Sequence, residues 1–245
     1  MKDFKLRIAI VGYGKMGKSI ERLALYRGHD IVLKISSSNK SELDAIKAKN
    51  VDVAIEFSSP AGAYENLTTL ASQGVNTVCG TTGWTDHYDS ICDQFNAAGA
   101  GFLHASNFSV GVNVLFAINE KLASLMSDFK DYGIGITEAH HITKRDAPSG
   151  TALSLANQIL KVNPRLKGWA MQEDAKEDHI PITSLREGDV KGLHEVTYSS
   201  AIDALTIRHE AFSREGFTLG AVLAAEFLAG KSGIHKMNEV LGLPS

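Results

Sequence analysis

The feature that most constrains the fold is a glycine-rich segment near the start of the printed sequence. Residues 12–17 read Gly-Tyr-Gly-Lys-Met-Gly, directly after the apolar run 6–11 and directly before helical apolar spacing at 19–25. In such a strand–turn–helix unit, Gly12 and Gly14 allow a tight turn and the close approach of a pyrophosphate to the helix N-terminus. The context predicts a dinucleotide-binding domain; a plain glycine-rich turn is the alternative.

The first half of the sequence alternates short apolar runs with helical patterns. After the glycine segment, strand-like runs occur at residues 31–35, 51–57, 76–79 and 101–105, and a helical pattern occupies residues 63–73. Strands separated by crossover helices pair in parallel. We therefore predict an α/β fold whose N-terminal domain is a Rossmann-like, doubly wound parallel sheet.

The alternation of strand-like and helical segments changes after about residue 113. Helical patterns at 112–126 and from Pro148 onward flank a strand at 132–139, and a strand-like region with turn residues fills 180–212. This region predicts an antiparallel meander within a C-terminal α+β domain built on an open mixed sheet. The apolar helix at 219–229 is expected to complete the first domain. The predicted domains are residues 1–107, completed by about 216–245, and residues 108–215.

Charge and cysteine content narrow the function classes. The 25 Lys and Arg residues are nearly balanced by 28 Asp and Glu residues, for a net charge of −3. Nucleic-acid and membrane-surface proteins need clustered positive charge, so neither partner is expected. With Cys79 and Cys92 as the only cysteines, a disulfide scaffold is excluded and a reducing compartment is favoured. No apolar run is long enough for a signal peptide or a membrane span, so we expect a soluble, cytoplasmic protein.

The end of the second predicted strand bears on cofactor choice. An Asp or Glu at this position binds the ribose 2′-hydroxyl of NAD, but residues 34–40 read Lys-Ile-Ser-Ser-Ser-Asn-Lys. Ser36, Ser37 and Lys40 suit a 2′-phosphate better, so NADPH is the favoured cofactor and NADH remains possible. The alternative is a polar loop whose lysine points to solvent.

Residues 138–151 bring two histidines, two cations and a helix start together. Histidine titrates near neutrality and can donate a proton, and Lys144 and Arg145 can neutralise carboxylates. Free backbone N–H groups at the helix start, residues 149–151, attract anions. The pattern fits an anionic substrate that must be protonated. A metal site is not expected because adjacent histidines rarely chelate one ion. The alternative without a function is a solvated loop that precedes a Ser-capped helix.

Four segments together resemble the 4-hydroxy-tetrahydrodipicolinate (dihydrodipicolinate) reductase family of the bacterial lysine and diaminopimelate pathway. They are residues 12–17, Gly-Thr-Thr-Gly at 80–83, Asn-Phe-Ser-Val-Gly-Val-Asn at 107–113, and 138–153. The resemblance implies a cofactor domain and a C-terminal domain whose open sheet builds a homotetramer. It implies cofactor contacts from Gly12, Tyr13, Gly14, Lys15, Met16, Gly80, Thr81, Thr82, Ala105, Ser106, Asn107 and Phe108. Longer family members carry an acidic residue at the second strand tip, where Ser36 stands here.

The same resemblance implies a mechanism. His140 is the expected proton donor and Lys144 its catalytic partner, while His141, Gly150 and Thr151 hold a small dicarboxylate substrate. The hydroxylated ring loses water, hydride passes from the nicotinamide to a conjugated imine, and His140 protonates the resulting enamine. The alternatives are an aspartate-type amino-acid dehydrogenase and a protein that senses the dinucleotide without turnover.

Overall fold

The computed structural model describes residues 5–213 and 215–244. The chain divides into two compact units, residues 1–110 with 215–245 and residues 111–214, which we describe separately. Within the described residues, no helix is long and apolar enough to cross a membrane.

The first unit is built on a six-stranded sheet in the order β11-β5-β4-β3-β1-β2, and every adjacent pair is parallel. The strands are β1 (Arg7–Val11), β2 (Asp30–Ile35), β3 (Val53–Glu56), β4 (Asn76–Cys79), β5 (Gly101–His104) and β11 (Gly233–His235). The chain runs from β1 to β2 on one side and then returns to β3 on the other. This topological switch point is where open α/β sheets bind ligands.

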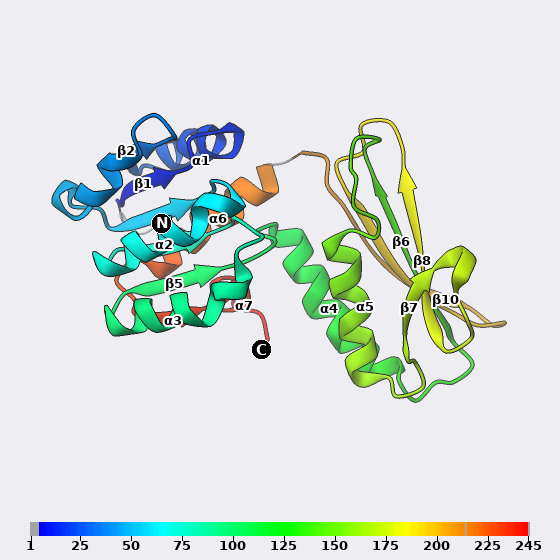
Figure 1. The fold of residues 1–245 in the computed structure, drawn as a ribbon. Helices are drawn as coiled ribbons and strands as arrows, with labels where there is room; N and C mark the ends of the chain where they lie inside the picture. The colour runs from blue at the N-terminus through cyan, green and yellow to red at the C-terminus, as the bar shows by residue number, and fades with distance from the viewer. Residues whose placement is uncertain (1–4, 214, 245) are drawn as a thin grey trace. The chain divides into compact units, whose positions relative to one another are not determined.

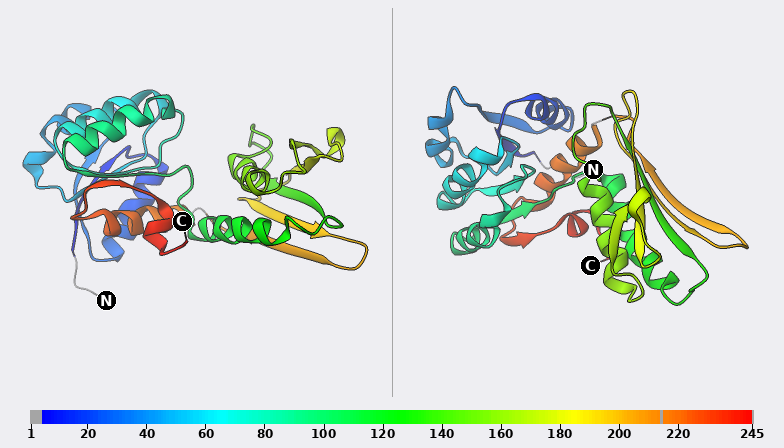
Figure 2. Two further views of the ribbon diagram at one scale, coloured as in Figure 1. Left: turned by 90° about the horizontal axis from the view of Figure 1, so that it is seen from below. Right: turned by 45° about the vertical axis from the view of Figure 1, so that its right-hand side comes forward.

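Helices cover both faces of this sheet, which confirms the predicted doubly wound fold (Figures 1 and 2). On one face, α2 (Pro60–Ser72) and α3 (Tyr88–Ala97) bury an apolar cluster that includes Leu67 and Phe95. On the other, α1 (Lys15–Tyr26), α6 (Glu215–Leu228) and α7 (Met237–Leu241) bury a second cluster. The left panel of Figure 2 shows α2 and α3 above the sheet and α6 below it.

The second unit contains a five-stranded mixed sheet in the order β10-β9-β6-β8-β7. Its strands are β6 (Gly133–His140), β7 (Gly168–Met171), β8 (His179–Arg186), β9 (Leu193–Ser199) and β10 (Ala204–Glu210). The helices α4 (Val110–Met126) and α5 (Gly150–Val162) lie on one face, as Figure 1 shows. Their apolar side chains pack with those of β6, β8 and β9.

The predicted antiparallel meander over residues 180–212 is wrong in one respect. Only β9 and β10 form an antiparallel hairpin, whereas β8 is parallel to β6 and separated from β9 by it. The link from β6 to β8 contains the helix α5, and a helical crossover suits parallel pairing. The connection from β8 to β9 therefore crosses the C-terminal end of β6, where the Glu187 N–H donates to the His140 carbonyl at 2.9 Å.

On the helix-covered face of the second sheet, the strand register brings apolar residues together first and polar residues next to them, toward the C-terminal end of β6. Ile136 of β6 is paired with Ile182 and Val196, and all three side chains are buried. Two residues further along β6, Glu138 is paired with His194 on β9, and directly paired residues share a face of the sheet.

Candidate active site

The glycine segment of the first unit forms a tight turn between β1 and α1. Gly12 has φ +99°, and a Cβ at this position would lie 2.1 Å from the Phe57 carbonyl oxygen. The N–H groups of Gly12 and Tyr13 both donate to the Ile35 carbonyl, at 2.9 and 3.0 Å. At Gly14, by contrast, an added Cβ would meet no atom of the described residues within 4 Å, apart from its neighbours along the chain, and none of their side chains caps α1 there. The turn therefore leaves the start of α1 accessible to an anionic group.

A cavity of about 240 Å³ opens at the carboxyl ends of the parallel strands. It brings together four of the residues that the sequence predicts for the cofactor: Met16, Gly80, Thr81 and Thr82. Phe57, Ser58 and Pro60 complete its lining and were not predicted. Their signal in the sequence is their place directly after the third strand, since ligands bind at the carboxyl ends of such strands.

A buried carboxylate ties the loops around this cavity together. Glu56, the last residue of β3, has no exposed surface and accepts hydrogen bonds from Ser58 Oγ and, at 3.2 Å, from Cys79 Sγ. The Ser58 N–H donates in turn to Thr81 Oγ1 at 2.8 Å. Burial, together with the Glu56 charge, raises the pKa of the Cys79 thiol well above its usual value. The thiol is thus a neutral donor, and the network links the segments after β3 and β4.

The tip of β2 is an ordered polar turn. The Ser36 N–H donates to Asn39 Oδ1 at 2.8 Å, and the hydroxyls of Ser36 and Ser38 lie 2.8 Å apart. Ser37 is exposed. Lys40 does not point freely into solvent, because its Nζ lies 2.5 Å from Glu65 Oε2 on α2.

The segment after β5 carries the remaining predicted cofactor residues. The Phe108 ring is buried, with its centroid 5.5 Å from that of Phe57, so its side chain belongs to the core. Asn107 Oδ1 accepts a hydrogen bond from the Ser109 N–H at 2.9 Å. Ala105 is half-buried and Ser106 is exposed.

In the second unit, Glu138 organises a cluster of polar side chains at the end of β6. Its carboxylate is fully buried, and its Oε1 accepts hydrogen bonds from Arg186 Nη2 at 3.0 Å and from the Ser149 N–H at 3.1 Å. Its Oε2 lies 3.2 Å from His140 Nδ1 and 3.8 Å from His194 Nε2. Burial pushes the pKa of this carboxyl upward, but hydrogen bonds from His140, Ser149 and Arg186 outweigh burial and hold the pKa well below its usual range.

His194 complements this carboxylate as a neutral group. Burial and, after it, the charge of His140 lower the pKa of His194 from 6.5 to about 4. Its Nε2 lies 3.1 Å from Ser149 Oγ, which also caps α5 by accepting from the Ala152 N–H. Neither His194 nor Arg186 was predicted, because each lies on a strand far along the chain from Glu138.

The loop between β6 and α5 holds the other predicted substrate residues. Lys144 Nζ is paired with both oxygens of Asp146, at 2.8 and 2.7 Å, and this hydrogen bonding lowers the pKa of Asp146. His141 Nδ1 lies 2.7 Å from Thr143 Oγ1. Gly150 and Thr151 form the first turn of α5, where N–H groups can receive a carboxylate.

The cluster could also be considered as a metal site. One ligand atom from each of Glu138, His140 and His194 lies within 4.8 Å of the others. The Arg186 guanidinium, however, already contacts the Glu138 carboxylate at 3.0 Å and would repel a metal cation. The charge arrangement favours proton handling over metal binding.

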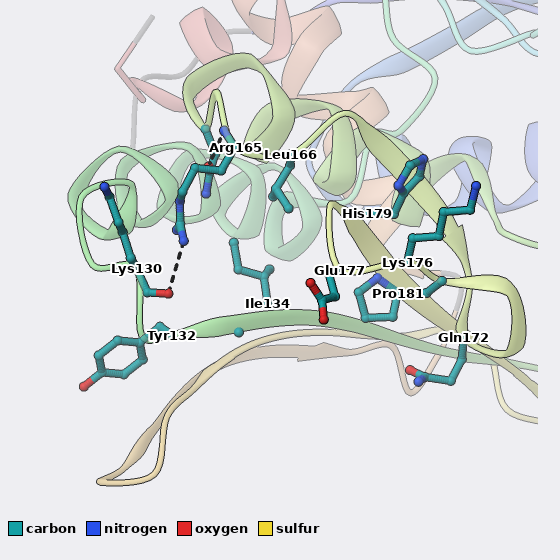
Figure 3. A pocket seen from close by; sticks show the side chains of 13 residues that line it. Lys130, Tyr132, Ile134, Arg165, Leu166, Gln172, Lys176, Glu177, His179 and Pro181 are labelled. Atoms are coloured by element: carbon teal, nitrogen blue, oxygen red, sulfur yellow. Dashed lines mark hydrogen bonds between the residues drawn. The ribbon is translucent and has the colours of Figure 1, made fainter.

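A second cavity, of about 440 Å³, lies at the opposite end of β6 (Figure 3). It is lined by Gly133 and Ile134 at the start of the strand, whereas His140 is the last residue of β6. Figure 3 shows Arg165 reaching toward Lys130, whose carbonyl it contacts at 3.2 Å. None of the predicted site residues lines this cavity.

Comparison with known families identifies the family to which the chain belongs. Residues 6–108 match the family model "Dihydrodipicolinate reductase, N-terminus", and residues 111–241 match "Dihydrodipicolinate reductase, C-terminus". The chain belongs to the dihydrodipicolinate reductase family. A curated relative, the 4-hydroxy-tetrahydrodipicolinate reductase of Christiangramia forsetii, is 47% identical over 236 residues, which cover 96% of this chain and 98% of the relative. The resemblance found in the sequence is thereby confirmed.

Solved structures agree on the fold. Dipicolinate-bound dihydrodipicolinate reductase from Paenisporosarcina sp. TG-14 is 23% identical, with a TM-score of 0.78 over 96% of this chain and 99% of that one. An amine dehydrogenase from Mycobacterium smegmatis is 12% identical, with a TM-score of 0.64 over 98% and 96% of the two chains. The fold is therefore shared with dehydrogenases outside the reductase family, and assignment of a reaction must rest on the site residues.

Proposed function

We propose that this protein reduces 4-hydroxy-tetrahydrodipicolinate to tetrahydrodipicolinate with a nicotinamide cofactor, as a step of lysine and diaminopimelate biosynthesis. The observation that carries the proposal is the 47% identity to a reductase of that name over nearly the whole of both chains. The 138–151 segment supports it, because its histidines, lysine and helix start provide a proton donor and a dicarboxylate site in one stretch.

In this proposal, residues 1–107 with 216–245 bind the cofactor and residues 108–215 bind the substrate. The open start of α1 at Gly14 suits the pyrophosphate, and the cavity beside Gly80 and Thr81 suits the nicotinamide. The bound, reduced nicotinamide supplies hydride. The chain's own groups position the ring, neutralise its carboxylates and deliver a proton.

The proton comes from His140. His141, Gly150 and Thr151 bind the two carboxylates of the substrate, and Lys144 adds positive charge once it exchanges Asp146 for the substrate. After hydride has reached the conjugated imine of the ring, His140 donates its proton to the ring carbon of the enamine. Such donation by a positioned group is worth roughly 10²- to 10⁴-fold in rate.

We further propose that NADPH is preferred over NADH. Support comes from the β2 tip, whose serine hydroxyls carry no charge and which is followed by the cation Lys40. Glu65 holds Lys40 at 2.5 Å, so a 2′-phosphate must compete with that carboxylate for the lysine. Both partners are largely exposed, and an exposed ion pair is weak enough to be exchanged.

The proposal includes a homotetramer in the cytoplasm. Both helices of the second unit lie on one face of its sheet, which leaves the other face for contacts between subunits. Both cysteines are free thiols, in keeping with a reducing compartment. Light scattering of the eluted protein should give about four times the 26.4 kDa chain mass, and a monomer mass would contradict the tetramer.

The reaction is tested by following reduced cofactor at 340 nm with substrate made in place by the upstream synthase. We expect rapid oxidation of NADPH and slower oxidation of NADH. Oxaloacetate with ammonia serves as the rival substrate of an aspartate-type dehydrogenase. Turnover of that pair alone, or tight NADPH binding without turnover of either substrate, would reject the proposed reaction.

A further inference from the structure

We propose that Glu138 is the positioning residue of His140: it fixes the imidazole with Nδ1–H toward its own carboxylate, so that Nε2 is the atom that exchanges a proton with the substrate. The catalytic part of this inference rests on the proposed function, whereas the tautomer is a property of the protein alone.

The backbone brings the two side chains together. Glu138 and His140 are two residues apart on β6, so both project from the same face of the sheet. His140 Nδ1 lies 3.2 Å from Glu138 Oε2, and the His140 side chain is only 10% exposed. No other carboxylate of the described ion pairs contacts His140.

The carboxylate is held ionised in this buried position. Arg186 Nη2 and the Ser149 N–H both donate to Oε1, at 3.0 and 3.1 Å. Arg186 also donates to the Asp146 carbonyl in the loop that follows β6. Because both donors contact Oε1, Oε2 accepts no hydrogen bond within the described residues, and the nearest ring nitrogen to it is His140 Nδ1 at 3.2 Å. An ionised oxygen at this distance favours the form of the ring that carries its hydrogen on Nδ1.

His194 does not compete effectively for the same oxygen. Its Nε2 is 3.8 Å from Oε2 but 3.1 Å from Ser149 Oγ. The rings of His140 and His194 meet edge to face, with centroids 5.1 Å apart. His194 thus packs beside the Glu138 carboxylate, but the shorter contact to Oε2 is the one made by His140 Nδ1.

The opposite edge of the His140 ring faces a glycine. Gly192 has φ +155°, and a Cβ there would lie 3.3 Å from Nε2 and 3.6 Å from Cδ2 of His140. Register explains this proximity, because Leu193 pairs with Ala139 in an antiparallel pair, so Gly192, directly before β9, comes opposite His140. A side chain at 192 would crowd Nε2, whereas glycine leaves this edge of the ring free of one.

The proton balance follows from this orientation. In the acid form both ring nitrogens carry hydrogen. Nε2–H passes to the substrate carbon, the bonding electrons stay on Nε2, and the neutral ring keeps Nδ1–H against Glu138. The carboxylate itself takes up no proton during the step.

The test is the ring tautomer of neutral His140, read by long-range ¹H–¹⁵N NMR of the full chain, with the resonance assigned by its loss in His140→Gln. We expect Nδ1–H in the wild type. In Glu138→Gln, Arg186 and the Ser149 N–H should retain the amide oxygen, which turns the NH₂ group toward Nδ1 and forces the Nε2–H tautomer. Glu195→Gln, on the opposite face of neighbouring β9, is the matched control.

Turnover provides the second readout. Glu138→Gln should lower kcat by about 10²- to 10⁴-fold, the range of a lost general acid, with the Kd for NADPH unchanged. An Nε2–H tautomer in the wild type overturns the inference, and so does unchanged kcat in Glu138→Gln. If Glu138→Gln fails to fold, the wild-type tautomer still decides. A wild type with the expected tautomer but no turnover would reject the proposed function and leave the positioning intact.

Discussion

The lowered pKa of His194 gives a prediction whose magnitude follows from the structure. The His194 side chain is 5% exposed, and burial, reinforced by the charge of His140, lowers its pKa from 6.5 to about 4. One pKa unit corresponds to about 1.4 kcal/mol. Because the folded protein keeps His194 neutral, the unfolding free energy changes by about 3 kcal/mol in total as the pH passes through the two pKa values of this histidine.

The sign follows from proton binding. Between pH 6.5 and 4 the unfolded chain binds a proton at His194 that the folded chain does not bind. The unfolding free energy therefore rises with pH across this window. The contribution is fully present above pH 6.5 and is lost as the pH falls toward 4.

Two measurements check this. In ¹H NMR, the His194 ring should titrate near pH 4. In urea unfolding followed by circular dichroism, the wild type should lose about 2 kcal/mol more than His194→Gln between pH 6.5 and 4.5. His87→Gln, at an exposed histidine of the other unit, controls for the loss of a histidine. A titration of His194 near 6.5, or equal losses in wild type and His194→Gln, would refute the reasoning.

Four further substitutions test other parts of the account. Gly12→Ala should lower the melting temperature and abolish NADPH binding, because its Cβ would overlap a backbone carbonyl at 2.1 Å; a normal melting curve would contradict the tight turn. Lys144→Ala should raise the substrate KM and lower kcat by roughly tenfold or more, since a cation leaves a dianion site, and unchanged kinetics would remove it from the mechanism. Lys40→Ala should weaken NADPH but not NADH in fluorescence titrations, while Glu65→Gln should strengthen NADPH by freeing the lysine; equal effects on both cofactors would argue against a 2′-phosphate contact.

The sequence predicts those features that depend on neighbouring residues. The glycine turn, its flanking strand and helix, and the parallel sheet all follow from local patterns, and the structure confirms them. The place of β8 could not be predicted in this way. Whether β8 pairs with β6 or β9 depends on which strand lies between them, and strand spacing along the chain does not encode that order.

The polar cluster at Glu138 shows the same limit. His140 and Lys144 stand out in the sequence because they share one unusual stretch. Arg186 and His194 reach the carboxylate only through strand register, 48 and 56 residues further along the chain. Likewise, the ion pair of Lys40 with Glu65 joins the loop after β2 to the helix α2. It could not be predicted from residues 36–40 because its partner lies 25 residues further along the chain.

The central claim is that His140 delivers the proton in a reductase reaction. The most direct measurement is the steady-state oxidation of NADPH at 340 nm with synthase-made 4-hydroxy-tetrahydrodipicolinate, for the wild type and His140→Gln, alongside the Kd for NADPH of each. The account predicts rapid wild-type turnover, a loss of roughly 10²- to 10⁴-fold in His140→Gln, and equal NADPH affinity. Near-normal turnover of His140→Gln, or no turnover of this substrate by the wild type, would contradict it.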